Sequence, residues 1–258
     1  MWNVRRLTDP TEILAFLERD RLYAAYAIGD LEPEMFQHSH WYLAEADGAA
    51  HSLILRFTAL DPDVLFLMGD AAGLAVILGS ALRPRRVFVC AMPEHLTTLR
   101  SFYRLGHPER VVRMVLDVNV FRPVSGEAAR LSPAYTRQLE RLYSMGEGNA
   151  FSPFQVAQGV FYGVTDKDRL VSTAGTHVFS ETYSVAAVGN VFTHPAYRRR
   201  GLGTLCTCAV VQELLARHIQ TIVLNVHENN DTARRIYQRL GFKEHCRYIE
   251  VLAERRSR

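Results

Sequence analysis

One segment of the chain recurs at a fixed offset, and this repeat constrains the fold more than any other feature. Adding 135 to each residue number aligns residues 87–116 with residues 222–251 without a gap. The aligned identities are Thr97 with Thr232, Arg100 with Arg235, Arg104 with Arg239, Leu105 with Leu240, Gly106 with Gly241 and Glu109 with Glu244. Both segments have the pattern strand, helix, Leu-Gly, strand, with glycine where a helix ends in left-handed backbone. This favours a duplicated unit, although two unrelated helices ending in Leu-Gly would also produce it.

The length of the chain agrees with two units. It has 258 residues, of which 48% are hydrophobic, and a domain usually has roughly 100 to 200 residues. Residues 121–133 contain two prolines, a glycine and few large apolar side chains, a composition typical of an exposed connection. We therefore predict domains at 1–125 and 126–258. Short apolar runs alternate with helical patterns in both, which predicts a mixed α/β fold.

Composition narrows the class of protein. A net charge of +3 does not require a nucleic-acid partner. Two histidines, His38 and His40, lack further metal-ligand spacing, so no metal is expected. Four cysteines without an N-terminal signal pattern favour a reduced, cytoplasmic protein over a disulfide-bonded one. They are Cys90, Cys206, Cys208 and Cys246.

The apolar run Val64–Leu82 is close to the length of a membrane span. Gly69-Asp70 interrupts it, and the interruption predicts a strand over 64–68, a turn, and a helix over 71–82 that Asp70 caps. We therefore expect no membrane span.

Residues 191–204, VFTHPAYRRRGLGT, predict an anion site in which a strand, an Arg/Gly loop and a helix follow one another. Gly201 and Gly203 permit close approach to the backbone, and the free N–H groups and dipole of the helix start attract negative charge. The spacing is neither the dinucleotide glycine pattern nor the P-loop pattern. A solvated basic turn is the alternative for the loop alone.

Residues 229–242, NNDTARRIYQRLGF, predict an amphipathic helix capped by Asn230 and ended by Gly241. Its apolar face carries Ala233, Ile236, Tyr237 and Leu240. Tyr237 alone would fit a core tyrosine with a satisfied hydroxyl.

Together the two runs resemble the GNAT superfamily of acyl-CoA-dependent N-acyltransferases. The family's R/Q-x-x-G-x-G/A signature is matched by Arg198, Gly201 and Gly203. Its later N-x-x-A-x-x-x-Y pattern, followed by Gly-Phe, is matched by Asn230, Ala233, Tyr237, Gly241 and Phe242. The resemblance covers about residues 131–252. It implies two GNAT-like mixed sheets flanked by helices, with catalysis in the second domain.

The resemblance also implies the site. Acetyl-CoA would lie between splayed parallel strands at 189–193 and 221–226, with Tyr237 as general acid for the CoA thiolate. The implied acetyl-CoA residues are Val191, Phe192, Thr193, Arg198, Arg199, Arg200, Gly201, Leu202, Gly203, Thr204, Asn230 and Ala233. The implied activity is transfer of an acetyl or short acyl group to a primary amine.

The general base remains open. No carboxylate occurs in residues 185–193, where some members of the family carry a glutamate. The polar residues nearby are His177, Glu181, His194, His227 and Glu228, and a water chain is equally suitable. Since an α-amine (pKa about 7.7 to 8.0) loses its proton more easily than a lysine amine (about 10.4), we expect a small, amino-acid-like acceptor. A silent acyl-CoA-binding module is the alternative.

The first half lacks these residues. Phe102 aligns with Tyr237 and His95 with Asn230, and residues 63–84 contain no Arg/Gly loop. We therefore expect a degenerate first domain that shapes the acceptor cleft.

Overall fold

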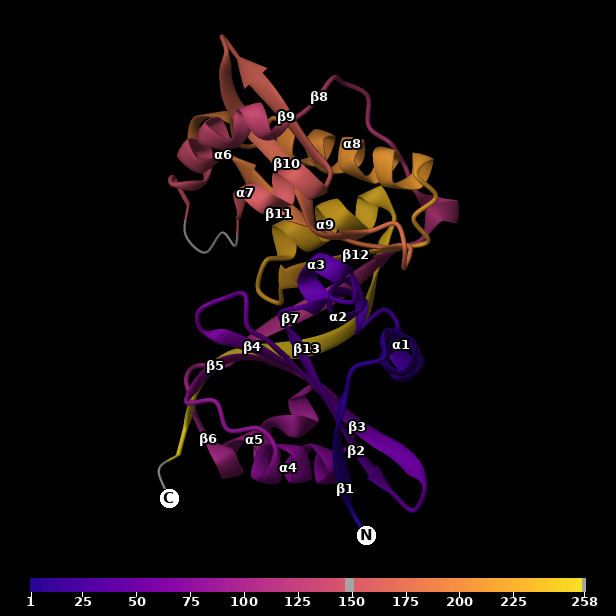
Figure 1. Ribbon diagram of the computed structural model, residues 1–258. Coiled ribbons are helices and arrows are strands. Elements are labelled where there is room, and N and C mark those ends of the chain that lie inside the picture. The colour runs from indigo at the N-terminus through magenta and orange to yellow at the C-terminus, as the bar shows by residue number, and fades with distance from the viewer. Residues whose placement is uncertain (147–150, 257–258) are drawn as a thin grey trace. The chain divides into compact units, whose positions relative to one another are not determined.

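The computed structural model describes residues 1–146 and 151–256. These residues divide into two compact units, one of residues 1–113 with 246–258 and one of residues 114–245. The expected mixed α/β class is confirmed, since each unit combines parallel and antiparallel strand pairs with helices (Figure 1).

In the first unit the strand order is β1-β2-β3-β4-β5-β13, with β6 beside β13. The strands are β1 (Asn3–Leu7), β2 (Ser39–Ala46), β3 (Ala49–Phe57), β4 (Asp63–Gly69), β5 (Arg86–Ala91), β6 (Tyr103–Leu105) and β13 (Phe242–Arg255). The helices are α1 (Pro10–Leu17), α2 (Ala25–Gly29), α3 (Pro33–Phe36), α4 (Ala71–Ser80) and α5 (Leu96–Phe102). Strands β4 and β5 are parallel, from Asp63 beside Val87 to Phe66 beside Cys90.

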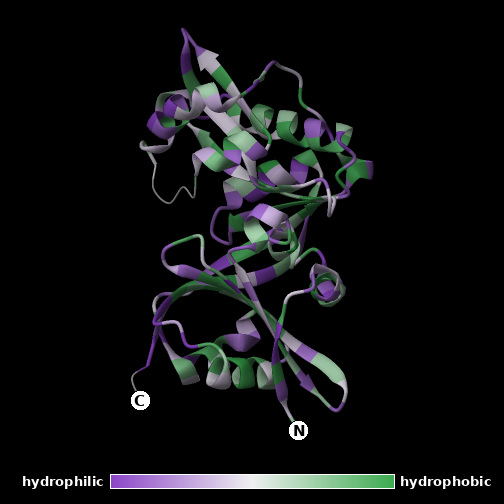
Figure 2. Ribbon diagram, viewed as in Figure 1, coloured by the Kyte–Doolittle hydropathy of each residue, from purple (hydrophilic) through white to green (hydrophobic). Residues whose placement is uncertain are grey.

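The run Val64–Leu82 folds as predicted, into β4, a turn at Gly69-Asp70 and α4. Oδ1 of Asp70 accepts the N–H of Gly73 at 2.7 Å, which caps the helix. Helix α4 is apolar along its length (Figure 2), and its Leu74, Ile77 and Leu78 are buried in the core of the unit. No helix in residues 1–146 or 151–256 is long and apolar enough to cross a membrane.

The last strand belongs to the first unit. Ile249 lies beside Ala91 and Glu254 beside Arg86, so β13 extends the sheet at β5. The unit bounds therefore differ from the predicted division into 1–125 and 126–258. An apolar alternation predicts that residues near 250 form a strand, but it does not specify which strand supplies the hydrogen bonds.

The second unit has the strand order β12-β11-β10-β9-β8. Its elements are β8 (Ala129–Arg130), α6 (Thr136–Tyr143), α7 (Pro153–Gln158), β9 (Phe161–Asp166), β10 (Arg169–Ser180), β11 (Val185–Thr193), α8 (Leu202–Ala216), β12 (Thr221–His227) and α9 (Asp231–Leu240). Strand β7 (Glu109–Leu116) crosses the boundary between the units. Helix α9 begins after Asn230 and ends before Gly241, as the sequence predicts.

Helices cover both faces of the sheet in the second unit (Figure 1). On one face, α6 and α7 contribute Leu139, Leu142, Tyr143 and Val156 to a core cluster that also packs against Phe192 of β11. On the other face, Gly203 of α8 lies against the side chains of Val191 and Thr193. Strand, helix and parallel strand therefore follow one another in both units, as β4-α4-β5 and as β11-α8-β12.

Candidate active site

Strands β11 and β12 begin as a parallel pair and then separate. Their pairing runs from Val185 beside Thr221 to Val188 beside Leu224. Residues 189–193 of β11 continue beyond this point and pair with β10. Among the described residues, the edge of β11 that faces β12 therefore has no strand partner over 189–193, as the predicted splay requires.

A β-bulge at Asn190 marks the point of separation. Asn190 has a left-handed φ of 51°, and the register between β10 and β11 shifts there by one residue. Asparagine tolerates this conformation better than most side chains. The bulge places two β11 residues opposite Ala174 and ends the regular alternation of the strand.

Three side chains hold the bulge, and we call Tyr143, Gln155 and His177 the bulge clamp. The hydroxyl of Tyr143 donates to the carbonyl of Asn190 at 2.7 Å. The backbone N–H of Asn190 donates to Nε2 of His177 at 3.2 Å, and its Nδ2 donates to Oε1 of Gln155 at 3.0 Å. Both backbone groups of Asn190 are therefore satisfied without β12, which allows the strands to separate.

The protonation states of the clamp fit these bonds. Burial raises the pKa of Tyr143, so its hydroxyl remains a donor. Burial lowers the pKa of His177 more than the contact with Asn190 raises it, so the imidazole is neutral at pH 7. A neutral ring that accepts at Nε2 carries its proton on Nδ1.

The Arg/Gly loop opens into the helix α8 as predicted. Gly201 has a left-handed φ of 76°, and a Cβ there would meet nothing within 4 Å. The N–H groups of Leu202, Gly203 and Thr204 have no acceptor among the described residues. The start of α8 therefore presents free donors and the positive end of the helix dipole to an open space.

The three arginines of the loop are exposed. Arg198 donates from Nε to the carbonyl of Thr193 at 3.3 Å and lies 5.8 Å from the ring centre of Phe192. Arg200 lies 5.3 Å from the ring centre of Tyr197. None of the three, Arg199 included, has a carboxylate partner in the part of the chain that is described. Their charges are therefore available to an anion.

Helix α9 carries Tyr237, whose hydroxyl forms no hydrogen bond with the described residues. Asn230 caps the helix through Oδ1, which accepts the N–H of Ala233 at 3.1 Å, and Gly241 ends it at a φ of 108°. Leu240 is buried, whereas Ala233 and Tyr237 are half-buried. Burial raises the pKa of Tyr237 to about 12. Its hydroxyl has no hydrogen-bond partner within residues 1–146 and 151–256, which differs from a core tyrosine with a satisfied hydroxyl.

Three of the polar residues considered as bases, namely Glu181, His194 and His177, have structural partners whose geometry is clear. Glu181 forms an ion pair with Arg217 at 3.2 Å. His194 accepts the N–H of Ala196 through Nδ1 and contacts Arg169 at 2.9 Å. His177 belongs to the bulge clamp. Sequence reasoning did not single out Tyr143, Gln155 or Asn190, and the only local signal was an asparagine directly after Gly189.

The corresponding places in the first unit are filled by its own side chains. The carboxylate of Asp70 occupies the start of α4, where α8 has free N–H groups. Nε2 of His95 contacts the carbonyl of Gly69 at 2.9 Å, which links the ends of β4 and β5. Phe102 stands at the position that aligns with Tyr237. The first unit therefore has neither an open anion site nor a proton donor at these positions.

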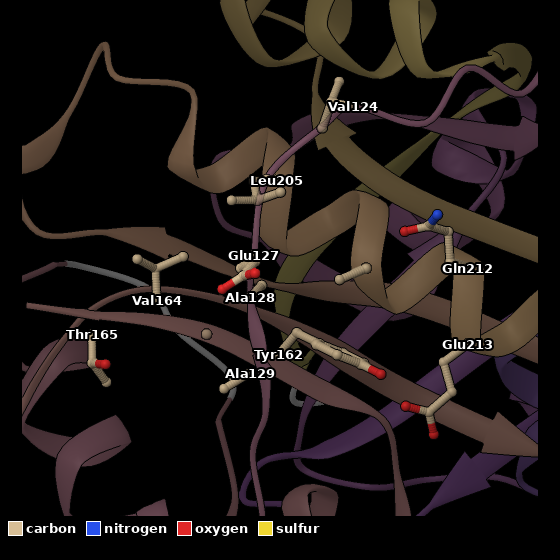
Figure 3. A pocket seen from close by; sticks show the side chains of 13 residues that line it. Val124, Glu127, Ala128, Ala129, Tyr162, Val164, Thr165, Leu205, Gln212 and Glu213 are labelled. Atoms are coloured by element: carbon tan, nitrogen blue, oxygen red, sulfur yellow. The ribbon is translucent and has the colours of Figure 1, made fainter.

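A separate pocket of about 640 Å³ lies between the connection at 124–129, strand β9 and helix α8 (Figure 3). Tyr162, Leu205, Gln212 and Glu213 are among its lining residues. None of its lining residues belongs to the predicted acetyl-CoA site. No cluster of three or more metal-ligating side chains occurs in the described ranges.

Comparison with known proteins identifies the second unit. The model of the acetyltransferase (GNAT) family matches residues 129–242. A ribosomal protein bS18 alanine N-acetyltransferase from Salmonella typhimurium is 33% identical over 81 residues, which are 31% of this chain and 53% of that protein. The chain thus spans about half the length of this curated relative. Residues 129–242 are a GNAT acetyltransferase domain.

Solved structures extend the likeness in fold to nearly the whole chain. A GCN5-related N-acetyltransferase from Kribbella flavida has a TM-score of 0.63 at 17% identity and covers 92% of this chain and 95% of its own. A tandem GNAT protein from the clavulanic acid biosynthesis pathway has a TM-score of 0.58 at 14% identity, with 98% of both chains covered.

Proposed function

We propose that this chain is an N-acetyltransferase that transfers an acetyl or short acyl group from acetyl-CoA to a primary amine, with catalysis in the second unit. The observation that carries the proposal is the Arg/Gly loop at the start of α8, which follows the splayed end of β11. Among the described residues, the first N–H groups of α8 have no acceptor and the arginines of the loop have no carboxylate partner. The GNAT match over residues 129–242 supports the same cofactor.

The residues present fit acetyl-CoA. The N–H groups of residues 202–204 and the guanidinium groups of Arg198, Arg199 and Arg200 would hold the pyrophosphate. The free edge of β11 at 191–193 would pair with the amide groups of the pantetheine arm, as a strand edge pairs with another strand. The bound thioester supplies the activated acyl group.

The protein then has two tasks in the reaction: it positions the amine and the thioester, and it provides the proton transfers. The amine nitrogen attacks the thioester carbonyl, a C–N bond forms, and the C–S bond breaks. Tyr237, which is protonated because burial raises its pKa to about 12, donates to the sulfur as negative charge develops. The amine loses its proton to water or to a base that is not a carboxylate of β11, since residues 185–193 contain none.

The proposed acceptor is a small, amino-acid-like α-amine. Such an amine has a pKa of about 7.7 to 8.0 and is partly neutral at pH 7, so it needs no strong base. The curated relative is named for acetylation of an alanine in a ribosomal protein, which supports an amino-acid amine as the class. The duplicated first unit is proposed to be a degenerate GNAT-like domain that shapes acceptor binding.

The test is release of free thiol from acetyl-CoA in the presence of single amines. The panel contains free α-amino acids, an Ala-initiated peptide and an α-blocked lysine. We expect α-amines to react fastest, and Tyr237→Phe to lower kcat by roughly 100-fold or more without weakening CoA binding. Tyr135→Phe is the control, since that hydroxyl has no hydrogen-bond partner among the described residues.

Two results would contradict the proposal. If the wild-type protein binds CoA but no amine increases thiol release, the chain is a silent acyl-CoA-binding module. If the lysine ε-amine is the best acceptor, the proposed substrate class is wrong.

A further inference from the structure

Two amide oxygens near the splay of β11 and β12 are buried without partners among residues 1–146 and 151–256. Oδ1 of Asn190 and Oδ1 of Asn225 are both inaccessible to solvent and accept no hydrogen bond from these described residues. Asn190 as a whole is only 5% exposed. Buried polar groups in folded proteins nearly always have hydrogen-bond partners. Two such oxygens without partners, both near the point where β11 and β12 separate, therefore require an explanation.

Strand register places Asn225 at the opening. Ala187 lies beside Val223 in the parallel pair, which ends one residue later. Because side chains alternate along a strand, Asn225 faces the same side of the sheet as Val223, and Gly189 faces the same side as Ala187. Asn225 and Gly189 therefore share a face directly after the last paired residues. Gly189 has no side chain, and the ring of His177 lies where its Cβ would project, with ring atoms 2.5 to 2.7 Å from that point.

That face is the one opposite α8. Thr173 lies beside Phe192 and Gly175 beside Gly189, so Gly189 and Phe192 share a face. The ring of Phe192 packs against Tyr143 of α6, whereas α8 contacts the other face. Asn225 and the ring of His177 therefore share the α6 side of the splay, and Asn190 is tied to this side through Gln155 of α7.

The chemistry of this group is specific. An amide oxygen accepts hydrogen bonds and carries no charge. Strands β11 and β12 contain no carboxylate, and His177 is neutral because burial lowers its pKa. The group thus offers two acceptors to an N–H donor but no negative charge to hold an ammonium ion. A neutral primary amine has two N–H donors and retains the lone pair that attacks the thioester.

We propose that the side-chain oxygens of Asn190 and Asn225 accept the N–H groups of the acceptor amine in its neutral form. This inference rests on the proposed acetyltransferase function and deepens it. The two asparagines are specificity residues that favour an α-amine over the more basic amine of lysine. Their oxygens have no partner among the described residues, and the bound amine would provide the donors.

The test uses Asn225→Leu, Asn225→Asp and Asn190→Gly. Leucine has nearly the shape of asparagine without its acceptor, aspartate retains the acceptor and adds charge, and glycine tolerates the left-handed backbone of residue 190. For each variant, the amine KM, the CoA Kd and the thermal midpoint are measured with an α-amino acid and an α-blocked lysine as acceptors.

We expect Asn225→Leu and Asn190→Gly to raise the α-amine KM about tenfold or more, the effect of one lost hydrogen bond in a buried site. The CoA Kd should change less than twofold. The thermal midpoint of Asn225→Leu should equal or exceed that of the wild-type protein, because the substitution removes a buried amide oxygen that has no hydrogen-bond partner among the described residues. Asn225→Asp should keep activity and shift preference toward the lysine amine.

Three results would overturn the inference while the wild-type protein remains active. An unchanged amine KM shows that the oxygens do not bind the acceptor. A weaker CoA Kd shows that they bind the pantetheine arm. A thermal midpoint several degrees lower for Asn225→Leu shows a structural role. If the wild-type protein acetylates no amine, the proposed function itself fails, and this inference fails with it.

Discussion

The hydroxyl of Tyr143 offers a sharp test of how the splay is maintained. It donates to the carbonyl of Asn190 at 2.7 Å, and both residues are 5% exposed. Tyr143→Phe keeps the ring and its contacts with Phe151 and Phe192, so it removes the hydrogen bond to the Asn190 carbonyl and leaves no cavity. An unsatisfied buried carbonyl costs about 1 to 3 kcal/mol.

This loss is large enough to measure. For a chain of this size, 1 kcal/mol corresponds to roughly 2 to 4 °C in the thermal midpoint, so Tyr143→Phe should lower it by about 2 to 12 °C. The carbonyl of Asn190 must then accept a hydrogen bond from another donor. A backbone N–H of β12 can provide it if the two strands pair further, and this pairing would close the splay. We therefore expect weaker CoA binding together with the lower midpoint.

The assay combines thermal unfolding with a CoA titration, and Tyr135→Phe is the matched control. Tyr135 packs against the same core cluster as Tyr143, and its hydroxyl has no partner in the described part of the chain. The reasoning is refuted if both variants unfold within 1 °C of the wild-type protein and bind CoA with equal affinity, since the clamp would then contribute nothing to the bulge.

Two further predictions concern the same unit. Because burial lowers the pKa of His177, its contribution to stability is complete above the unfolded value of about 6.5 and is lost as the pH falls toward the lowered folded value, by at most about 1.4 kcal/mol per pH unit. Urea unfolding at pH 7.5 and 5.5 should show that the free energy of unfolding falls less for His177→Gln than for the wild-type protein when the pH is lowered. Equal decreases would contradict the lowered pKa of His177. Gly203→Ala should change the free energy of unfolding by less than about 1 kcal/mol, since alanine favours the helix and its methyl group meets Thr193 at 3.3 Å. The same methyl group points toward Val191 and Thr193, so CoA affinity should fall about tenfold or more, whereas Gly79→Ala in α4 should leave it unchanged.

Local signals in the sequence were sufficient for the helix ends and the anion loop. Asp70 and Asn230 each accept an N–H three residues ahead, and Gly241 ends α9 in left-handed backbone. Each of these interactions joins residues within one turn of helix, so the residue types alone carry the information. The helices α1 and α2 and the strand β1 were not predicted, although Asp9 followed by Pro10 is a helix-start signal.

Distant pairings were decided by the tertiary structure. Tyr143 and Asn190 are 47 residues apart, and Gln155 and Asn190 are 35 apart, so no periodicity predicts the bulge clamp. The partner of β13 was likewise undetermined, because a strand pattern specifies which residues face the core and leaves open which neighbouring edge receives the backbone hydrogen bonds. The sequence by itself thus determined that the Arg/Gly loop opens α8 and that α9 carries Tyr237. Only the folded sheet decided where the strands separate, because that depends on which remote side chains satisfy the backbone of Asn190.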